Sequence, residues 1–150
     1  MSTAVRLTSI AEIEAAPNIG ALLDEYAAQS SIKGLPNPSA SFPLYKQLES
    51  AGALTVFGAF IEQILIGFIT ILAPLNPHYS VRLPVVESFF VAKEYRKFGA
   101  GLKLLKHAEL WAKGIGSGIL VSAPFGSDLA KLLPRRGYTQ TNRVFFKCLA

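Results

Sequence analysis

The chain has 150 residues, of which 51% are hydrophobic and 17% are charged, and its net charge is +5. This length and composition predict one folded domain, residues 1–150, with a proper core, and they exclude a disordered chain. The single cysteine, Cys148, cannot form an intramolecular disulfide or supply a pair of metal ligands. We therefore expect no metal site and a reducing, cytoplasmic compartment.

The N-terminal half predicts helices first and then an apolar hairpin. A short strand is expected at residues 5–9 and a helix at 10–29, which Pro17 and Gly20 break or delay. Residues 30–43 hold three prolines and four serines and predict a loop, and a short helix is expected at 44–51. The apolar stretches 53–61 and 64–73 predict two buried strands joined at Glu62-Gln63. A membrane span would place Glu62 near the bilayer centre, so we expect no membrane association.

The C-terminal half alternates predicted strands and helices. A turn at 74–77 leads to a strand at 83–92 and an amphipathic helix at 100–113, which Gly114 and Gly116 end. A buried strand is expected at 118–123, a helix at 127–136, and a final strand pair at 138–140 and 143–149. The order predicts an α/β fold with a mixed, mostly antiparallel sheet flanked by helices. Because residues 144–149 are apolar and predicted to lie at a sheet edge, we expect pairing with a second copy in a homodimer.

One segment carries most of the functional information. The apolar run 89–92 is followed by Lys93-Glu94-Tyr95, then by Arg96-x-x-Gly99-x-Gly101, and directly by the helix at 100–113. Glycines allow a ligand to approach the backbone, and the first N–H groups of a helix have no partner within it. The positive end of the helix dipole and the two cations Arg96 and Lys97 favour an anion. This strand, turn and helix predict a phosphate or pyrophosphate site.

With these elements around it, the motif resembles the central acyl-CoA site of the GNAT superfamily of acyl-CoA-dependent N-acyltransferases. The resemblance covers nearly the whole chain and is strongest over residues 86–114, with Gly67 in the third strand as a further match. It implies a central β-turn-α site for acetyl-CoA. Backbone groups of the strand would pair with the pantetheine arm, and amides of the turn would wrap the pyrophosphate. The cofactor-binding residues implied by the resemblance are Phe89, Phe90, Val91, Ala92, Arg96, Lys97, Phe98, Gly99, Ala100, Gly101 and Leu102.

The resemblance also suggests catalytic groups, with one clear departure. It implies an oxyanion donor in a backbone N–H near Val91, and it makes Glu87 the candidate general base, directly or through water. A half-buried carboxylate beside an apolar strand would have a raised pKa, which suits a base, although Glu87 could instead be a structural residue. Many family members place a tyrosine in the last helix as the general acid, but this chain has Leu133 there. Tyr79, Tyr138 or Ser127 would have to supply the proton, or the thiolate leaves without an acid.

The sequence therefore predicts an N-acetyltransferase that transfers an acetyl group from acetyl-CoA to a primary amine by direct attack. The acceptor, a small molecule or a protein, is not readable from the sequence. The alternative is a catalytically weak acyl-CoA-binding module or sensor, which the leucine at position 133 favours. Nucleic-acid binding is not expected, because the basic residues are spread along the chain without the interleaved aromatics of a nucleic-acid motif.

Overall fold

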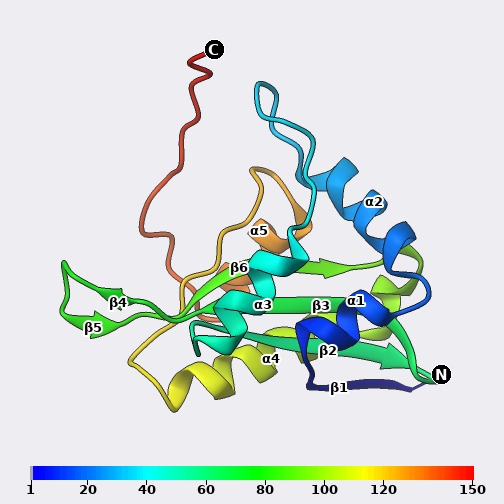
Figure 1. Cartoon of the computed structure of the whole chain (residues 1–150). Helices are drawn as coiled ribbons and strands as arrows, with labels where there is room; N and C mark the ends of the chain where they lie inside the picture. Colours follow the sequence, from blue (N-terminus) through cyan, green and yellow to red (C-terminus); the bar gives the residue numbers. More distant parts are fainter. Residues whose placement is uncertain (1) are drawn as a thin grey trace.

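The computed structural model describes residues 2–150 and is built on a four-stranded antiparallel sheet (Figure 1). Its strand order is β1-β2-β3-β6, where β1 is Thr3–Leu7, β2 is Leu54–Ile61, β3 is Ile64–Leu72 and β6 is Val85–Val91. The sheet confirms the predicted α/β class. Strands β2 and β3 are buried along nearly their whole length, which agrees with their apolar sequences.

The hairpin between β2 and β3 turns where the sequence predicts it. Glu62 and Gln63 have φ values of 50° and 69°, so both lie in the left-handed region that a two-residue hairpin turn requires. Leu54 pairs with Leu72 at one end of the ladder and Ile61 with Ile64 at the other. The apolar stretch 53–75 is thus a pair of core strands, and no helix among residues 2–150 is long and apolar enough to cross a membrane.

Three helices cover one face of the sheet: α1 (Ile10–Ala15), α2 (Ile19–Ser30) and α3 (Phe42–Ser50) (Figure 1). The helix predicted at 10–29 is interrupted near Pro17, as the sequence indicates. The side chains of Ser9 and Ser41 accept hydrogen bonds from backbone N–H groups of α1 and α3, which caps both helices. Residues 31–41 between α2 and α3 form the predicted loop.

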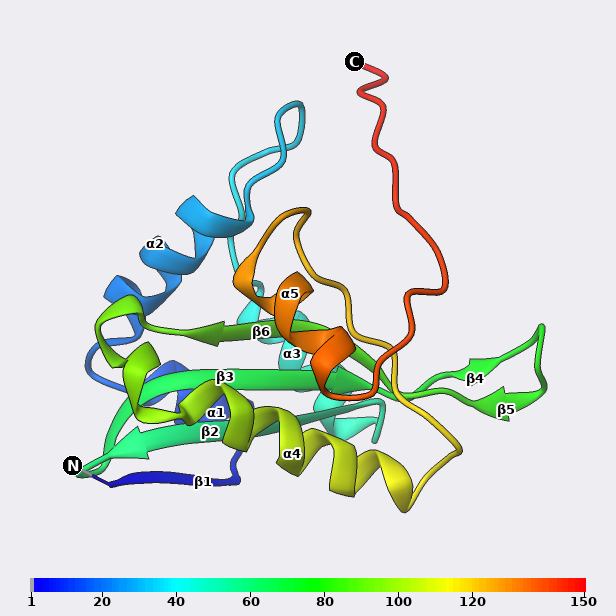
Figure 2. The same ribbon diagram turned by 180° about the vertical axis from the view of Figure 1, so that it is seen from behind.

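The opposite face carries α4 (Ala100–Lys113) and α5 (Asp128–Arg135) (Figure 2). Helix α4 buries its apolar face against the strands, with Ala100, Leu104 and Ala108 fully buried. This matches the predicted face of the helix at 100–113 and leaves its lysines exposed. A 3₁₀ helix, Lys93–Phe98, occupies the turn between β6 and α4.

The predictions for the last third of the chain are wrong in two places. Residues 118–123 form no strand, because only Leu120 bridges the sheet, in parallel with Val85. Residues 138–150 form no strand pair either and extend away from the body of the molecule (Figure 2). The apolar sequence of 143–149 has high β propensity, but propensity yields a strand only where a paired neighbour exists. In this structure Phe145 is 87% exposed and Leu149 is 89% exposed.

A small second sheet replaces the predicted turn after β3. Strands β4 (Leu75–Asn76) and β5 (Val81–Arg82) pair antiparallel and project from the main sheet (Figure 1). Asn76 organises the tip, because its side-chain oxygen accepts hydrogen bonds from the N–H groups of His78 and Tyr79. The ring of Tyr79 is 65% exposed at this tip.

Candidate active site

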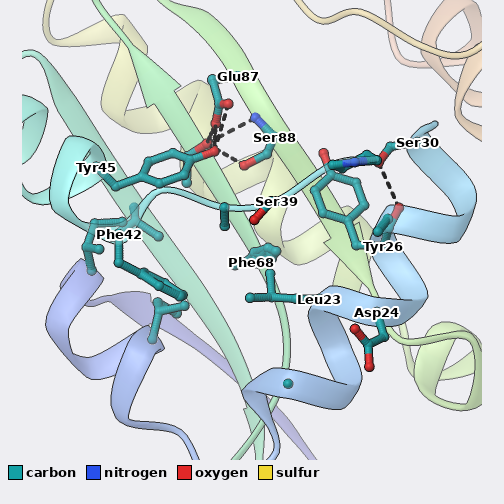
Figure 3. Close-up of a pocket in the computed structure, with 18 residues that line it drawn as sticks. Leu23, Asp24, Tyr26, Ser30, Ser39, Phe42, Tyr45, Phe68, Glu87 and Ser88 are labelled. Atoms are coloured by element: carbon teal, nitrogen blue, oxygen red, sulfur yellow. Dashed lines mark hydrogen bonds between the residues drawn. The ribbon is translucent and has the colours of Figure 1, made fainter. Parts of the chain in front are cut away.

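Glu87 is the extra residue of a β-bulge in β6. Thr70 of β3 pairs with Ser88, and Ile71 pairs with Val86, so Glu87 has no partner in the register. A bulge bends the strand and changes the direction of a side chain at that point. The Glu87 carboxylate and the Ser88 hydroxyl therefore both lie on the face of the sheet that α2 and α3 cover (Figure 3).

Two hydroxyl groups hold the Glu87 carboxylate. Tyr45 of α3 lies with its hydroxyl 2.8 Å from Oε1 and 3.0 Å from Oε2, and the Thr70 hydroxyl donates to Oε2 at 2.7 Å (Figure 3). Because an ionised carboxylate only accepts, the single Thr70 proton is committed to Glu87. The Ser88 hydroxyl must then donate to Thr70 Oγ1 across their 2.7 Å contact, and the Ser88 N–H donates there too. The network fixes the orientation of the carboxylate. Glu87 itself is exposed, so the half-buried position expected from the sequence is wrong.

The hydroxyl groups of Tyr26 and Tyr45 keep their protons at neutral pH. Burial, and then the negative charge of Glu87, raise the pKa of the Tyr45 hydroxyl well above its ordinary value. Burial also raises the pKa of Tyr26, whose hydroxyl accepts a hydrogen bond from the N–H of Phe89 at 3.4 Å. Both hydroxyls stay protonated across the neutral range, and Tyr26 keeps its own proton free to donate.

The outer edge of β6 is open beyond its first residues. Val86 N–H donates to Leu120 O and Leu120 N–H to Pro84 O, but residues 118–123 pair no further. Ala92 N–H donates to Ile66 O of β3. Because backbone groups alternate in direction along a strand, the N–H and C=O groups of Phe89 and Val91 point away from β3, to the outer edge. Within residues 2–150, no strand pairs with this edge at Phe89 or Val91. The edge leaves backbone groups accessible to an extended ligand.

Gly67 of β3 lets β6 come close at this point. A Cβ on Gly67 would lie 2.6 Å from the Phe90 carbonyl oxygen and 3.0 Å from the Val91 Cα. Both distances are shorter than ordinary carbon contacts allow, so any larger residue would push the strands apart. The glycine thus sets the position of the backbone at Val91.

The Arg96–Gly101 turn is built as a strand-to-helix connection with its amides at the start of α4. Gly99 has φ +74°, the left-handed conformation that favours glycine, and it directly precedes Ala100 at the helix start. The N–H groups of Ala100, Gly101 and Leu102 belong to the first turn and have no partner within the helix. Lys97 and Phe98 are exposed on the same turn. The turn thus presents backbone N–H groups and the positive charge of Lys97 at the start of α4.

The Arg96 side chain has a structural role in addition. Its Nε donates to Val91 O at 2.9 Å, and its Nη2 lies 2.6 Å from Gln29 Oε1 and 3.9 Å from Glu25 Oε2 of α2. Glu25 also accepts from the N–H of Lys93 at 2.9 Å. The guanidinium therefore joins α2 to the end of β6, and the turn is tied to the helix that carries Tyr26.

A cavity of about 610 Å³ opens beside Glu87, which we call the Glu87 cavity (Figure 3). Its walls come from α1, α2, α3, the 31–41 loop and the sheet. Glu87, Ser88, Thr70 and Tyr45 contribute hydroxyl and carboxylate groups to its lining. The apolar and aromatic lining residues include Ile10, Ile13, Leu23, Phe42, Val56 and Phe68. A cavity of this size, mostly apolar with a few polar groups, is typical of a small-molecule site.

None of the three hydroxyl groups that the sequence suggests as the general acid lies at the Glu87 site. Tyr138 donates to Glu109 of α4 at 2.7 Å, Ser127 caps α5, and Tyr79 is at the tip of the projecting hairpin. Leu133 is buried, with 8% of its surface exposed. A second cavity, about 290 Å³ between α4 and α5, is lined by Lys106, Arg135 and Arg136 together with Glu109 and two leucines.

Sequence reasoning missed the residues that surround Glu87. Tyr26 and Tyr45 fall within predicted helices and Thr70 and Ser88 within predicted strands, where nothing local marks them as site residues. Only the pairing of β3 with β6 brings Thr70 to Ser88, and only the packing of α3 brings Tyr45 to the carboxylate. A polar residue within each of two otherwise apolar strands was the signal available in the sequence.

Comparison with known proteins places the chain in a family. The family model described as "Acetyltransferase (GNAT) family" matches residues 21–131, so the chain belongs to the GNAT family of acetyltransferases, enzymes that act on amino groups. No curated protein matches the sequence. Glu87, strand β6 and the Arg96–Gly101 turn all lie within the matched residues.

Solved structures agree in fold at low sequence identity. The ribosomal-protein-alanine N-acetyltransferase from Brucella melitensis biovar Abortus 2308 has a TM-score of 0.71 at 18% identity, covering 98% of both chains. The aminoglycoside acetyltransferase meta-AAC0020 from an uncultured soil metagenomic sample, in complex with trehalose, has a TM-score of 0.72 at 18% identity, covering 99% of this chain and 97% of that one. AAC(6')-Iy in complex with the bisubstrate analogue CoA-S-monomethyl-acetylneamine has a TM-score of 0.71 at 18% identity, covering 98% and 97%.

Proposed function

We propose that this chain, folded as one domain, is an N-acetyltransferase that moves the acetyl group of acetyl-CoA to the primary amine of an acceptor bound in the Glu87 cavity. The observation that carries the proposal is the position of Glu87. It lies at the bulge of β6, between an apolar cavity and the outer edge of β6. The Arg96–Gly101 turn follows the end of this strand. A carboxylate between an acceptor site and a cofactor site is placed to take a proton from an attacking amine.

The cofactor lies along the outer edge of β6 and over the following turn. Tyr26 and the Arg96 side chain already engage Phe89 N–H and Val91 O, which leaves Phe89 O on this edge for the pantetheine arm and Val91 N–H for the thioester carbonyl oxygen. The amides from Arg96 to Leu102 bind the pyrophosphate, and Lys97 adds charge. The basic side chains of the cavity between α4 and α5 fit the remaining phosphate of the nucleotide end.

The reaction is direct attack. Glu87 first takes one proton from the ammonium group, directly or through water. The neutral amine nitrogen then bonds to the thioester carbonyl carbon while Val91 N–H stabilises the oxyanion, and the nitrogen loses its second proton to water as the amide forms. The carbon–sulfur bond then breaks and coenzyme A leaves as a thiolate. Tyr26, whose hydroxyl contacts the edge at Phe89, protonates the thiolate in place of a side chain at Leu133, and water returns a proton to Tyr26.

The test is a thiol-release assay with the full chain, acetyl-CoA and a panel of primary amines, with the acetylated product identified by mass spectrometry. The proposal expects acetyl-CoA-dependent product for at least one amine. Tight coenzyme A binding without thiol release above background for any amine would instead support a binding module or sensor. The buried leucine at position 133 is the one feature that favours that second function.

We also propose that two copies associate through residues 144–149. Val144 and Phe145 are 85% and 87% exposed, which is unusual for large apolar side chains that have no other role. Light scattering across a range of concentrations is expected to show a dimer, and Phe145→Glu to give a monomer. A monomer at every concentration would contradict the association without affecting the proposed chemistry.

A further inference from the structure

We infer that the acceptor is a small primary amine with an apolar, preferably aromatic, body and a single ammonium group that lies at Glu87. The inference rests on the proposed function, since it names the substrate class of the same cavity. Neither the sequence motif nor the family indicates this class. It follows from the charge, the walls and the arrangement of polar groups in the Glu87 cavity.

The charge of the cavity selects a cation. Asp24 and Glu87 are its charged lining residues, and none of the described lining residues is Lys, Arg or His. The chain as a whole carries a net charge of +5, so this is a local reversal of sign. Such a site attracts an ammonium group and disfavours acceptors that carry phosphate or carboxylate groups. The acceptor therefore approaches as a cation and loses one proton to Glu87 before it attacks.

The walls select an apolar body. Four aromatic rings, from Tyr26, Phe42, Tyr45 and Phe68, line the cavity together with buried aliphatic side chains such as Val56. Two of these rings pack edge to face, Tyr26 on Phe68 at 5.7 Å between centroids. Apolar surface of this kind binds rings and branched alkyl groups, which leave water favourably.

The strongest polar cluster is at one end, where Tyr45, Thr70 and Ser88 lie around Glu87. Asp24, Ser30 and Ser39 also line the cavity but lie outside that cluster (Figure 3), and the Ser30 hydroxyl already donates to Tyr26 O at 2.8 Å. An acceptor with polar groups along its whole length, such as an aminosugar or a peptide, would bury several of them against carbon without hydrogen bonds. One ammonium group at Glu87, followed by a hydrocarbon body, matches this polar cluster and the apolar and aromatic walls beside it. The volume of about 610 Å³ leaves room for one or two rings.

The first measurement compares 2-phenylethylamine with ethylamine, which share the reacting group and differ by the ring. Burying a phenyl-sized group is expected to raise kcat/KM by roughly 10- to 100-fold. An alanine-leading peptide, an aminoglycoside and 1,3-diaminopropane complete the panel. The inference is overturned if ethylamine is used as well as 2-phenylethylamine, or if any of the three polar acceptors is used better.

A pair of variants on α3 locates the selectivity. Phe42→Ala removes a ring from the cavity wall without removing a member of the Glu87 network, and it should lower kcat/KM for 2-phenylethylamine about tenfold more than kcat/KM for ethylamine. Leu44→Ala is the matched control, because Leu44 is two residues away on the same helix, is 54% exposed and does not line the cavity. Equal effects of the two substitutions would contradict the inference.

Binding separates this inference from the function on which it rests. If no amine releases thiol, the proposed function fails, and calorimetry then decides the ligand class. Binding of 2-phenylethylamine at least tenfold tighter than ethylamine, weakened by Phe42→Ala, supports an aromatic-amine site even without turnover. Equal or undetectable binding of both amines overturns the inference. If turnover occurs with a polar acceptor, the function stands and only the substrate class is wrong.

Discussion

The hydroxyl of Tyr45 lies 2.8 Å from Oε1 of Glu87 and 3.0 Å from Oε2, so one donor from α3 spans both oxygens of the carboxylate on β6. The two residues are 42 positions apart in the sequence, and the contact joins a wall of the cavity to the proposed base. The orientation of Glu87 thus depends on the position of α3. Several consequences of this contact and its surroundings can be measured.

Tyr45→Phe should slow acetyl transfer while leaving cofactor binding intact. A hydrogen bond to a charged group contributes about 1.5 kcal/mol, so its loss predicts roughly a tenfold lower kcat/KM for the amine. Steady-state kinetics at saturating acetyl-CoA measure the effect. Tyr79→Phe, on the exposed hairpin tip, is the control and should behave as the unmodified chain.

The same variant should change stability at high pH. Because the pKa of Tyr45 is raised in the folded chain, its contribution is fully present below the unfolded value of about 10 and is lost as pH rises from there toward the folded pKa. Urea unfolding between pH 9 and 11 should therefore show a smaller loss of stability for Tyr45→Phe than for the unmodified chain. Some loss should persist in the variant, because burial raises the pKa of Tyr26 and Tyr138 as well. Parallel curves for the two proteins would argue against this account of Tyr45.

Gly67→Ala should destabilise the sheet and weaken the cofactor site together. The added Cβ would meet the Phe90 carbonyl at 2.6 Å, and relieving such overpacking costs about 1–3 kcal/mol. Because β6 must shift, the affinity for acetyl-CoA should fall too. Urea unfolding and calorimetry measure the two effects.

Gly20→Ala is the matched control for that substitution. A Cβ at Gly20 meets no atom within 4 Å, and Gly20 lies inside α2. Alanine there should stabilise the chain by about 0.4–1 kcal/mol by reducing the entropy of the unfolded state. If both variants changed stability in the same direction, close approach of β3 and β6 would not explain the role of Gly67.

Arg96→Lys should loosen α2 even though the positive charge is kept. A lysine ammonium cannot reproduce the planar set of donors that reaches Val91 O and Gln29 Oε1 together. Amide hydrogen exchange in residues 19–30 should become faster, and acetyl-CoA should bind more weakly. Lys97→Ala removes a neighbouring charge and should weaken only cofactor binding, with a dependence on salt. Unchanged exchange in Arg96→Lys would mean that the guanidinium does not hold the helix.

Much of the fold follows from local sequence patterns. Apolar residues spaced three and four positions apart over residues 100–113 specify α4. The apolar runs on either side of Glu62-Gln63 specify the β2–β3 hairpin. These elements are set by residues close in sequence. The prediction of a final strand pair was wrong. Residues 143–149 have the composition of a strand, but a strand forms only beside a paired neighbour, and these residues have none in the described chain.

The candidate site was predictable only in part. Glu87 and the Arg96–Gly101 turn were found because they are contiguous with a recognisable strand and helix. The donors around Glu87 were not, because the bulge in β6 and the register of Thr70 with Ser88 depend on pairing between distant segments. The second role of Arg96, in holding α2, is likewise visible only once the helix is packed against the turn.

The most direct test of the account is the rate of acetyl transfer by Glu87→Gln. Glutamine is close to glutamate in shape but cannot act as the base, so kcat should fall by about 100-fold or more, while the dissociation constant for acetyl-CoA stays unchanged. A variant that retains the full rate at every pH would contradict the assignment of Glu87 as the group that takes the amine proton.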